Sequence, residues 1–219
     1  ENYLYHNNGN GTFTNVGLES GTAFSENGNA TAAMGGDFGD IDLDGNLDLI
    51  VPDMTFNSTY LNLGNGYFED ASVILGIAEL SGQYWSWGGD FFDYDNDGDL
   101  DIIIANGSGH RLSGTQEMLI MANVASLPTP GPSKEGRGRV FQDIAGQSGA
   151  YFRHKSVSRG LATGDYDNDG DLDIFVLNID QPSVLLRNDG SNRNNWLMFN
   201  LIGTKSNRDG LGSRVTVRT

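Results

Sequence analysis

The chain has 219 residues, of which 37% are hydrophobic and 10% aromatic, and this is enough apolar surface to argue against wholesale disorder. Glycine supplies 31 residues and proline only 5, a composition that favours tight turns between many short elements over a helical bundle. The formal charge is −16, so we expect no nucleic acid partner. No apolar stretch approaches the roughly 18–20 residues of a membrane span, and cysteine is absent.

Short strands are predicted along the whole chain. It opens at Glu1, without a methionine, in a strand-like stretch that leads through a glycine-rich turn to a second one around Phe13. Four strands are then predicted, the last two joined by a Gly-Asn-Gly turn, at residues 31–38, 47–52, 58–63 and 67–71. The pattern recurs twice, with a Pro/Gly-rich insertion around residues 127–136 that lengthens one surface turn.

Four strands in a repeat of roughly 50–60 residues are typical of a propeller blade. The fold class is therefore predicted to be all-β, built of four-stranded antiparallel β-propeller blades. Residues 1–190 contain half a blade, two full blades and a partial blade. A closed ring needs at least about four blades. We therefore expect a partial propeller in an open arc, cut from a longer protein, with apolar strand faces exposed at both ends of the arc.

Acidic residues gather in three places. Of the 29 Asp and Glu residues, 14 lie in three nine-residue windows, and the 15 others are nearly matched by 13 Lys and Arg. These windows, called here the first, second and third aspartate loops, are residues 40–48, 93–101 and 165–173. The negative charge is thus a local feature that needs an explanation at each loop.

Each aspartate loop has the pattern Asp-x-Asp-x-Asp-Gly-x-x-Asp. Carboxylates at positions 1, 3, 5 and 9 and a backbone carbonyl at position 7 supply the hard oxygen ligands that calcium prefers. The glycine at position 6 permits the positive φ needed to turn the chain around an ion. A solvated acidic turn is the alternative, but its carboxylates would repel one another without a neutralising cation. Three calcium ions are expected, one per loop.

An EF-hand begins similarly but needs a bidentate Glu at position 12 and flanking helices. Position 12 is instead Val51, Ile104 or Val176, each inside an apolar run that reads as a buried strand. The arrangement is therefore strand-loop-strand, and position 9 must complete the coordination. These apolar runs also predict that each central strand is covered on both faces by neighbouring blades.

The aspartate loops with their following Ile/Val runs resemble the FG-GAP/VCBS repeats of integrin-α-like β-propellers, over about residues 1–190. The stretch that begins Asn195-Trp-Leu-Met-Phe-Asn-Leu-Ile-Gly is similar to the start of an ASPIC/UnbV domain, as in the cartilage-acidic-protein-like family. The resemblance implies two domains, with propeller blades at 1–190 and the start of an ASPIC/UnbV-like β module at 191–219.

The resemblance also implies the calcium ligands, with position 7 binding only through its backbone oxygen. Carried over by position, they are Asp40, Asp42, Asp44, Asn46 and Asp48; Asp93, Asp95, Asp97, Asp99 and Asp101; and Asp165, Asp167, Asp169, Asp171 and Asp173.

A protein of this kind would lie outside the cell, in the periplasm or at the cell surface, and would act as a recognition or adhesion scaffold. Its expected partners are a protein or glycan ligand and the remaining blades of the full-length chain. We expect no enzyme, because the sequence has no Gly-x-Ser-x-Gly and no phosphate loop.

The alternative is a lectin-type or carbohydrate-active propeller, a lyase or a hydrolase. It would need a pocket with two carboxylates roughly 5–10 Å apart that bind no metal. Trp85 and Trp87 either pack between blades or form a platform for a sugar.

Overall fold

The structure is a computed structural model that describes residues 1–108, 114–124, 141–179, 181–190, 194, 196–205, 207–210, 213 and 215–217. Its described strands are β1 Tyr5–Asn7, β2 Phe13–Asn15, β3 Asp37–Gly39, β4 Asp48–Val51, β5 Ser58–Asn62, β6 Phe68–Asp70, β7 Ser86–Phe92, β8 Asp101–Asn106, β9 Leu119–Asn123, β10 Phe141–Asp143, β11 Ser158–Gly164, β12 Asp173–Asn178 and β13 Val184–Leu186. Short helical turns connect them at α1 Gly17–Ser20, α2 Ile77–Ser81 and η1 Ala150–Arg153.

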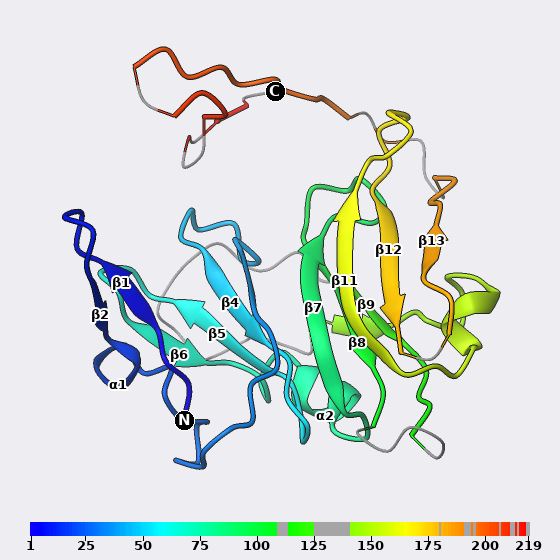
Figure 1. The fold of residues 1–219 in the computed structure, drawn as a ribbon, viewed down its shortest axis with the longest axis horizontal. Helices are drawn as coiled ribbons and strands as arrows, with labels where there is room; N and C mark the ends of the chain where they lie inside the picture. The colour runs from blue at the N-terminus through cyan, green and yellow to red at the C-terminus, as the bar shows by residue number, and fades with distance from the viewer. Residues whose placement is uncertain are drawn as a thin grey trace.

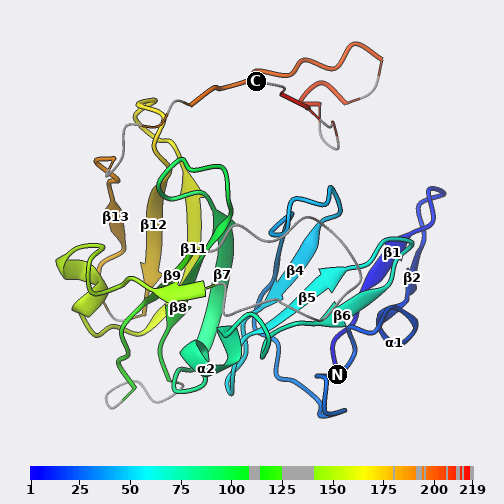
Figure 2. The same cartoon turned by 180° about the vertical axis from the view of Figure 1, so that it is seen from behind.

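The strands form four antiparallel sheets that follow one another in chain order. Their orders are β1-β2, β3-β4-β5-β6, β7-β8-β9-β10 and β11-β12-β13. Figure 1 shows these sheets side by side, and Figure 2 gives the same arrangement from behind. The predicted all-β fold of four-stranded blades in a partial propeller is confirmed. We call the sheets the half blade and the first, second and third blades.

The half blade corresponds to the outer two strands of a complete blade. Its last pair in register is Asn7 opposite Phe13. The same Asn–Phe pair closes the outer hairpin of the first blade, Asn62 opposite Phe68, and an Asn–Phe pair recurs in the second blade. The repeated sequence therefore sets the register as well as the strands.

The structure differs from the sequence-based prediction in two respects. The first strand of the first blade begins at Asp37, and residues 31–36 before it are not strand. The short helical turns were not predicted, because four or five residues carry too weak a periodicity to be recognised. The predicted insertion around residues 127–136 lies outside the described residues.

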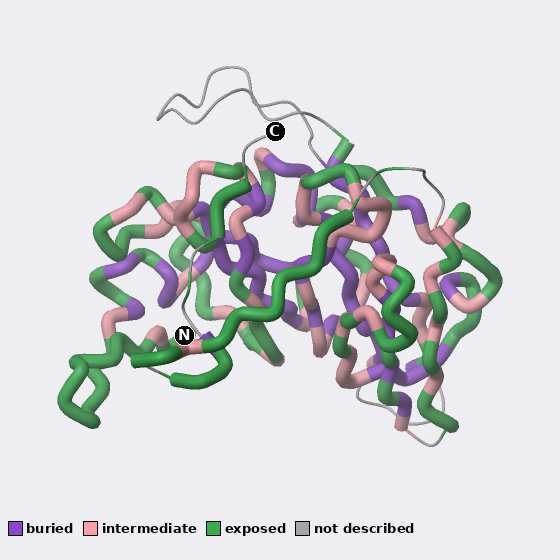
Figure 3. Tube along the Cα trace, turned by 90° about the horizontal axis from the view of Figure 1, so that it is seen from above, coloured by how far each residue is buried: buried purple, intermediate pink, exposed green. Residues whose placement is uncertain are grey.

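Apolar cores lie between successive sheets, and the buried parts of the trace gather toward the middle of the molecule (Figure 3). Ile102 and Ile104 of β8 belong to a cluster with Ile50 and Leu61 of the first blade. Ile103, between them in sequence, joins a cluster that includes residues of the third blade. Because neighbouring side chains of a strand point to opposite faces, β8 is covered on both faces, as predicted.

The third blade leaves part of its surface uncovered. Its central strand β12 alternates between buried and exposed residues beyond Ile174, whereas every residue of β8 is buried. Phe175 of β12 is 46% exposed, and its partner in register, Leu185 of β13, is 49% exposed. The half blade likewise exposes Tyr5 and Phe13. The predicted exposure of apolar strand faces at the ends of the arc is confirmed, whereas the prediction that each central strand is covered on both faces is wrong for β12, which has no described blade beyond it.

The first strands of neighbouring blades are joined by aspartates outside the loops. The Asp37 carboxylate on β3 accepts a hydrogen bond of 2.9 Å from the backbone N–H of Phe91 on β7. Asp90, at the same place in the next repeat, accepts a backbone N–H from Thr163 on β11. Burial, followed by the charge of Asp37, raises the pKa of Asp90 to about 6.

The described residues beyond Leu186 form neither helix nor strand. The β module at 191–219 therefore stays a prediction. In both ribbon views this last part of the chain passes on the side of the molecule where the blades' aspartate loops lie (Figures 1 and 2). Within the described part of the chain, no helix is both long and apolar enough to cross a membrane.

The exposed end of the arc leads to a first prediction. An uncovered apolar strand face is a site for association in a soluble protein. Residues 1–219 should self-associate reversibly, and the double substitution Phe175→Ser with Leu185→Ser should lower the average mass measured by light scattering. Exposed Leu18→Ser on α1, which is 72% exposed and outside this face, is the control. A wild-type protein that is monomeric at all concentrations would contradict the expectation.

A second prediction concerns Asp90. Its folded-state pKa of about 6 lies above the ordinary value of the unfolded chain. The folded state therefore binds this proton more tightly than the unfolded state does, and it loses stability as the pH rises from about 4 to about 6. Asp90→Asn removes the cost of the buried charge while its amide oxygen still accepts the Thr163 N–H. The variant should melt at a higher temperature than wild type at pH 8, with little difference at pH 4. An equal shift at both pH values would show that the charge is not the cause.

Candidate metal centre

The three aspartate loops connect the first and second strands of their blades. They follow β3, β7 and β11 and lead directly into β4, β8 and β12. In Figure 1 all three connections lie at the upper end of their sheets. Position 9 of each loop is also the first residue of the central strand, so the loop is continuous with the best-buried part of the blade.

The loop backbones share two residues with positive φ. The glycines at position 6 have φ of 89°, 94° and 96° in Gly45, Gly98 and Gly170, as the sequence predicted. Position 4 is also left-handed, with φ of 56°, 54° and 61° in Leu43, Asn96 and Asn168. The left-handed position 4 was not predicted from the sequence. Asn at two of the three places is a recognisable signal, because Asn adopts this conformation at a lower cost than Leu does.

The aspartate at position 1 closes each loop. Its Oδ2 accepts the N–H of the position-6 glycine at 2.9 Å in the first loop and 3.0 Å in the other two. In the second and third loops its Oδ1 accepts the position-5 N–H at 3.1 Å. In the first loop the position-5 residue is Asp44, and its N–H instead donates a hydrogen bond to Asp42 Oδ1 at 3.3 Å. Oδ1 of Asp40 is buried there and has no hydrogen-bond partner in the described part of the chain.

The aspartate at position 9 is almost fully buried, with 1%, 2% and 1% exposure in Asp48, Asp101 and Asp173. One oxygen accepts the N–H of position 2 of the same loop, at 2.9, 3.0 and 3.1 Å. The other accepts the N–H of an asparagine at or just after the end of the third strand, at 2.7, 2.8 and 2.8 Å. Each carboxylate therefore ties its loop to the outer part of the blade.

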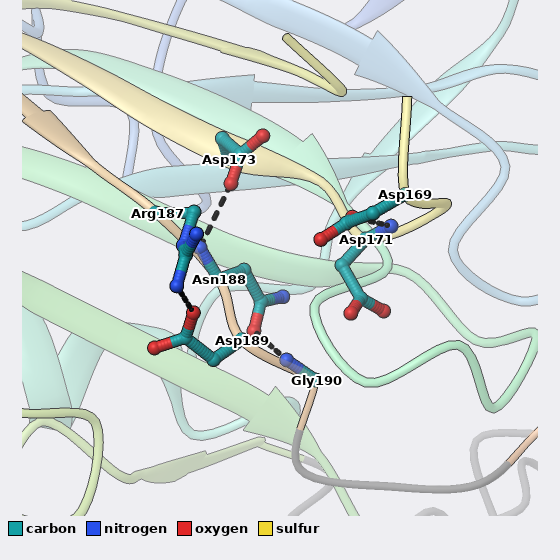
Figure 4. A network of polar contacts seen from close by, with 7 residues as sticks. All are labelled: Asp169, Asp171, Asp173, Arg187, Asn188, Asp189 and Gly190. Atoms are coloured by element: carbon teal, nitrogen blue, oxygen red, sulfur yellow. Dashed lines mark hydrogen bonds and ion pairs between the residues drawn. The ribbon is translucent and has the colours of Figure 1, made fainter. Parts of the chain in front are cut away.

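These asparagines, Asn62, Asn123 and Asn188, were not recognised from the sequence. Two of them precede a glycine by two residues, and their Oδ1 accepts that glycine's N–H at 3.0 Å for Asn62 and 3.2 Å for Asn188. An Asn-x-Gly turn at the end of the third strand is the signal that could have found Asn62 and Asn188, whereas Asn123 is followed by Val124 and Ala125 and gives no such signal. Figure 4 shows the third case, with Asn188 between Asp173 and Gly190 and the Arg187–Asp189 ion pair beside them.

Carboxylates from positions 1, 3 and 9 come together in every loop. In each group one oxygen atom per residue lies within 4.8 Å of the others. Oxygens that share an ion at about 2.3–2.6 Å lie up to roughly 5 Å apart, so each group could hold a metal ion. The groups are Asp40, Asp42 and Asp48; Asp93, Asp95 and Asp101; and Asp165, Asp167 and Asp173.

The other predicted ligands, at positions 5 and 7, are joined to each other by a hydrogen bond. The position-5 Oδ1 accepts the N–H of position 7 in all three loops, at 2.7 Å in Asp44–Asn46 and 3.0 Å in both Asp97–Asp99 and Asp169–Asp171. Figure 4 shows this contact in the third loop. The position-7 side chains of Asn46 and Asp171 take part in further hydrogen bonds. Their role as ligands stays a prediction.

Burial makes the negative charge of these loops unfavourable without a cation. It raises the pKa of Asp48 and of Asp101 to about 7, although two backbone N–H groups act on each carboxylate in the opposite direction. Burial also raises the pKa of Asp93 and Asp95, and the charge of Asp97 adds to both. Oδ1 of Asp95 is a second buried oxygen without a hydrogen-bond partner. Two of the three loops thus contain a ligand-competent oxygen that no group of the described residues satisfies.

Comparisons with known proteins agree with the repeat. A family model described as FG-GAP-like repeat matches residues 1–51 and again 40–104, which include the first and second loops. The chain is 33% identical to human (Homo sapiens) cartilage acidic protein 1 over 124 residues. That alignment covers 56% of this chain and 15% of the relative, so the chain spans a small part of that protein's length.

The strained position 4 of the first loop leads to a prediction. A left-handed Leu costs roughly 1–2 kcal/mol, which Asn largely avoids. Leu43 is 59% exposed, so Leu43→Asn loses little packing and should raise the melting temperature by about 1–4 °C. Leu47→Asn in the same loop, where the residue is similarly exposed and φ is not positive, should give no increase. An equal increase in both variants would show that replacing an exposed leucine by a polar residue, and not relief of backbone strain, is the cause.

Proposed function

We propose that this chain, which belongs to the FG-GAP-like repeat family and is related to cartilage acidic protein 1, binds calcium in its three aspartate loops and serves as a recognition scaffold outside the cytoplasm. The observation that carries the proposal is the convergence of three carboxylates in each loop, together with the buried, unpartnered oxygens of Asp40 and Asp95.

The donor set favours calcium among the common metals. Each group offers only carboxylate oxygens, with no histidine or cysteine of the kind that zinc and copper prefer. A glycine-containing loop that adds further oxygens from positions 5 and 7 suits the flexible six- to eight-fold coordination of calcium better than the strict octahedron of magnesium. Bound calcium would neutralise the buried charge and hold the strand ends together, and no reaction step is required of it.

The location follows from the expected affinity. Calcium sites of extracellular modules have Kd values of about 10⁻⁴–10⁻³ M, and the low free calcium of a cytosol would leave such sites empty. An extracellular, periplasmic or cell-surface location is therefore part of the proposal. So is the partner, a protein or glycan ligand, with the remaining blades of a longer chain covering the exposed face around Phe175.

The carbohydrate-active alternative has no comparable support in the described residues. A cavity of about 770 Å³ lies at the second and third blades, lined by residues such as Phe92 and Ile174. Its one lining carboxylate, Asp189, pairs with Arg187. Trp87 donates to the carbonyl of Gly107 at 2.6 Å, and the Arg159 guanidinium of the next blade lies 3.7 Å from its ring centre. Trp87 therefore packs between blades, and the described lining of the cavity offers no pair of free carboxylates.

The proposal predicts how Asp97→Ala behaves. An ion that binds only the folded state adds about 2.7 kcal/mol at a hundredfold excess over Kd. The variant should show weaker calcium binding by calorimetry and a melting temperature about 5–10 °C below wild type in saturating calcium. In chelator the two should melt within about 2 °C, because removing one carboxylate from the metal-free loop relieves repulsion.

Glu26→Ala, an exposed acidic residue outside the loops, is the matched control and should change neither measurement. If wild type binds no calcium, or binds magnesium more tightly, the proposed function is wrong. Equal destabilisation of Asp97→Ala with and without calcium would assign Asp97 a purely structural role.

A further inference from the structure

The second and third aspartate loops touch each other, although they belong to different blades. Asn96, at position 4 of the second loop, donates from Nδ2 to Asp171 Oδ1 at 2.7 Å and to the carbonyl of Gly170 at 3.3 Å. Both acceptors lie in the third loop. The left-handed backbone of Asn96 projects this side chain from between Asp95 and Asp97, two predicted ligands of the second ion.

In a second contact the donor lies in the third blade and the acceptor in the second loop. Asn188 donates its backbone N–H to Asp173 of the third loop at 2.8 Å. Its Nδ2 donates to the carbonyl of Tyr94 at 2.7 Å, between Asp93 and Asp95 of the second loop. A single asparagine thus holds a position-9 carboxylate of one loop and the backbone of the other.

The corresponding residues of the other blades act within their own loops. Asn62 donates from Nδ2 to the carbonyl of Leu47 at 2.9 Å, and Asn123 donates to that of Leu100 at 3.5 Å. Position 4 of the first loop is Leu43, which has no side-chain donor. The bridging contacts are therefore specific to the second and third loops among the described residues.

We propose that the second and third loops bind their cations cooperatively, as one coupled pair, while the first loop binds its cation independently. Asn96 and Asn188 are the positioning residues of this coupling. The inference rests on the proposed function. An ion that orders residues 93–97 fixes Asn96 and the Tyr94 carbonyl, and these fix residues 170–171 and Asn188 in the third loop. By thermodynamic reciprocity the third ion has the same effect on the second.

The test is a calcium titration of residues 1–219 followed by NMR, with the position-6 glycine amides as one reporter per loop. Gly98 and Gly170 should titrate together with a Hill coefficient above 1, and Gly45 separately. Asp169→Ala disables the third loop and should weaken calcium binding at Gly98 about fivefold or more, the usual size of such coupling. Binding at Gly45 should not change.

Asn96→Gly removes both side-chain hydrogen bonds of Asn96 and keeps a residue that accepts positive φ. In this background Asp169→Ala should have a smaller effect at Gly98. Leu43→Gly makes the equivalent change in the first loop and should leave the Gly98 and Gly170 curves as in wild type.

If Asp169→Ala leaves Gly98 binding unchanged in the wild-type background, the coupling is wrong while the calcium sites stand. If no glycine responds to calcium, the proposed function fails and the coupling with it. If Asn96→Gly leaves the effect of Asp169→Ala undiminished, the assignment of Asn96 as a positioning residue is overturned.

Discussion

The position-9 aspartate is the interaction on which each blade depends. Its carboxylate accepts one N–H from its own loop and one from the end of the third strand, in three repeats with nearly the same distances. A carboxylate that is 1–2% exposed is unfavourable as an anion, and burial raises the pKa of Asp48 and Asp101 to about 7. The group that organises the blade is therefore also the one that most needs a neighbouring cation.

This dual role explains why the loops lie where they do. Position 9 is the first residue of the central strand, and the apolar residues that follow it pack, in β8, against both neighbouring sheets. Charge and apolar core are thus separated by a single peptide unit. A cation bound at the loop, as proposed, would neutralise the buried anion at the end of the strand, so metal binding and the packing of blades would stabilise the same element.

The sequence predicted the features that depend on neighbouring residues in the chain. Repeated aspartates, the turn glycines such as Gly98 and the apolar run of β8 identify loops, strands and blades. Contacts between repeats could not be predicted, because the Asn188 bond to Tyr94 joins residues 94 positions apart and depends on how two blades pack. The left-handed Leu43 was missed for a related reason, since the loop imposes on it a conformation that its own side chain disfavours.

Repeats that look equivalent in sequence differ at single positions, and those positions control how the blades interact. Asp37 and Asp90 join neighbouring first strands, whereas the third repeat has Ala162 at this place. Asn96 reaches the adjacent loop, whereas its counterpart Leu43 has no donor to do so. The aspartate pattern gives the first, second and third blades the same group of three carboxylates, and in our proposal the variable residue at position 4 decides whether a loop binds its cation alone or with its neighbour. Differences between repeats of one chain therefore indicate how the sites interact, which the shared pattern alone does not.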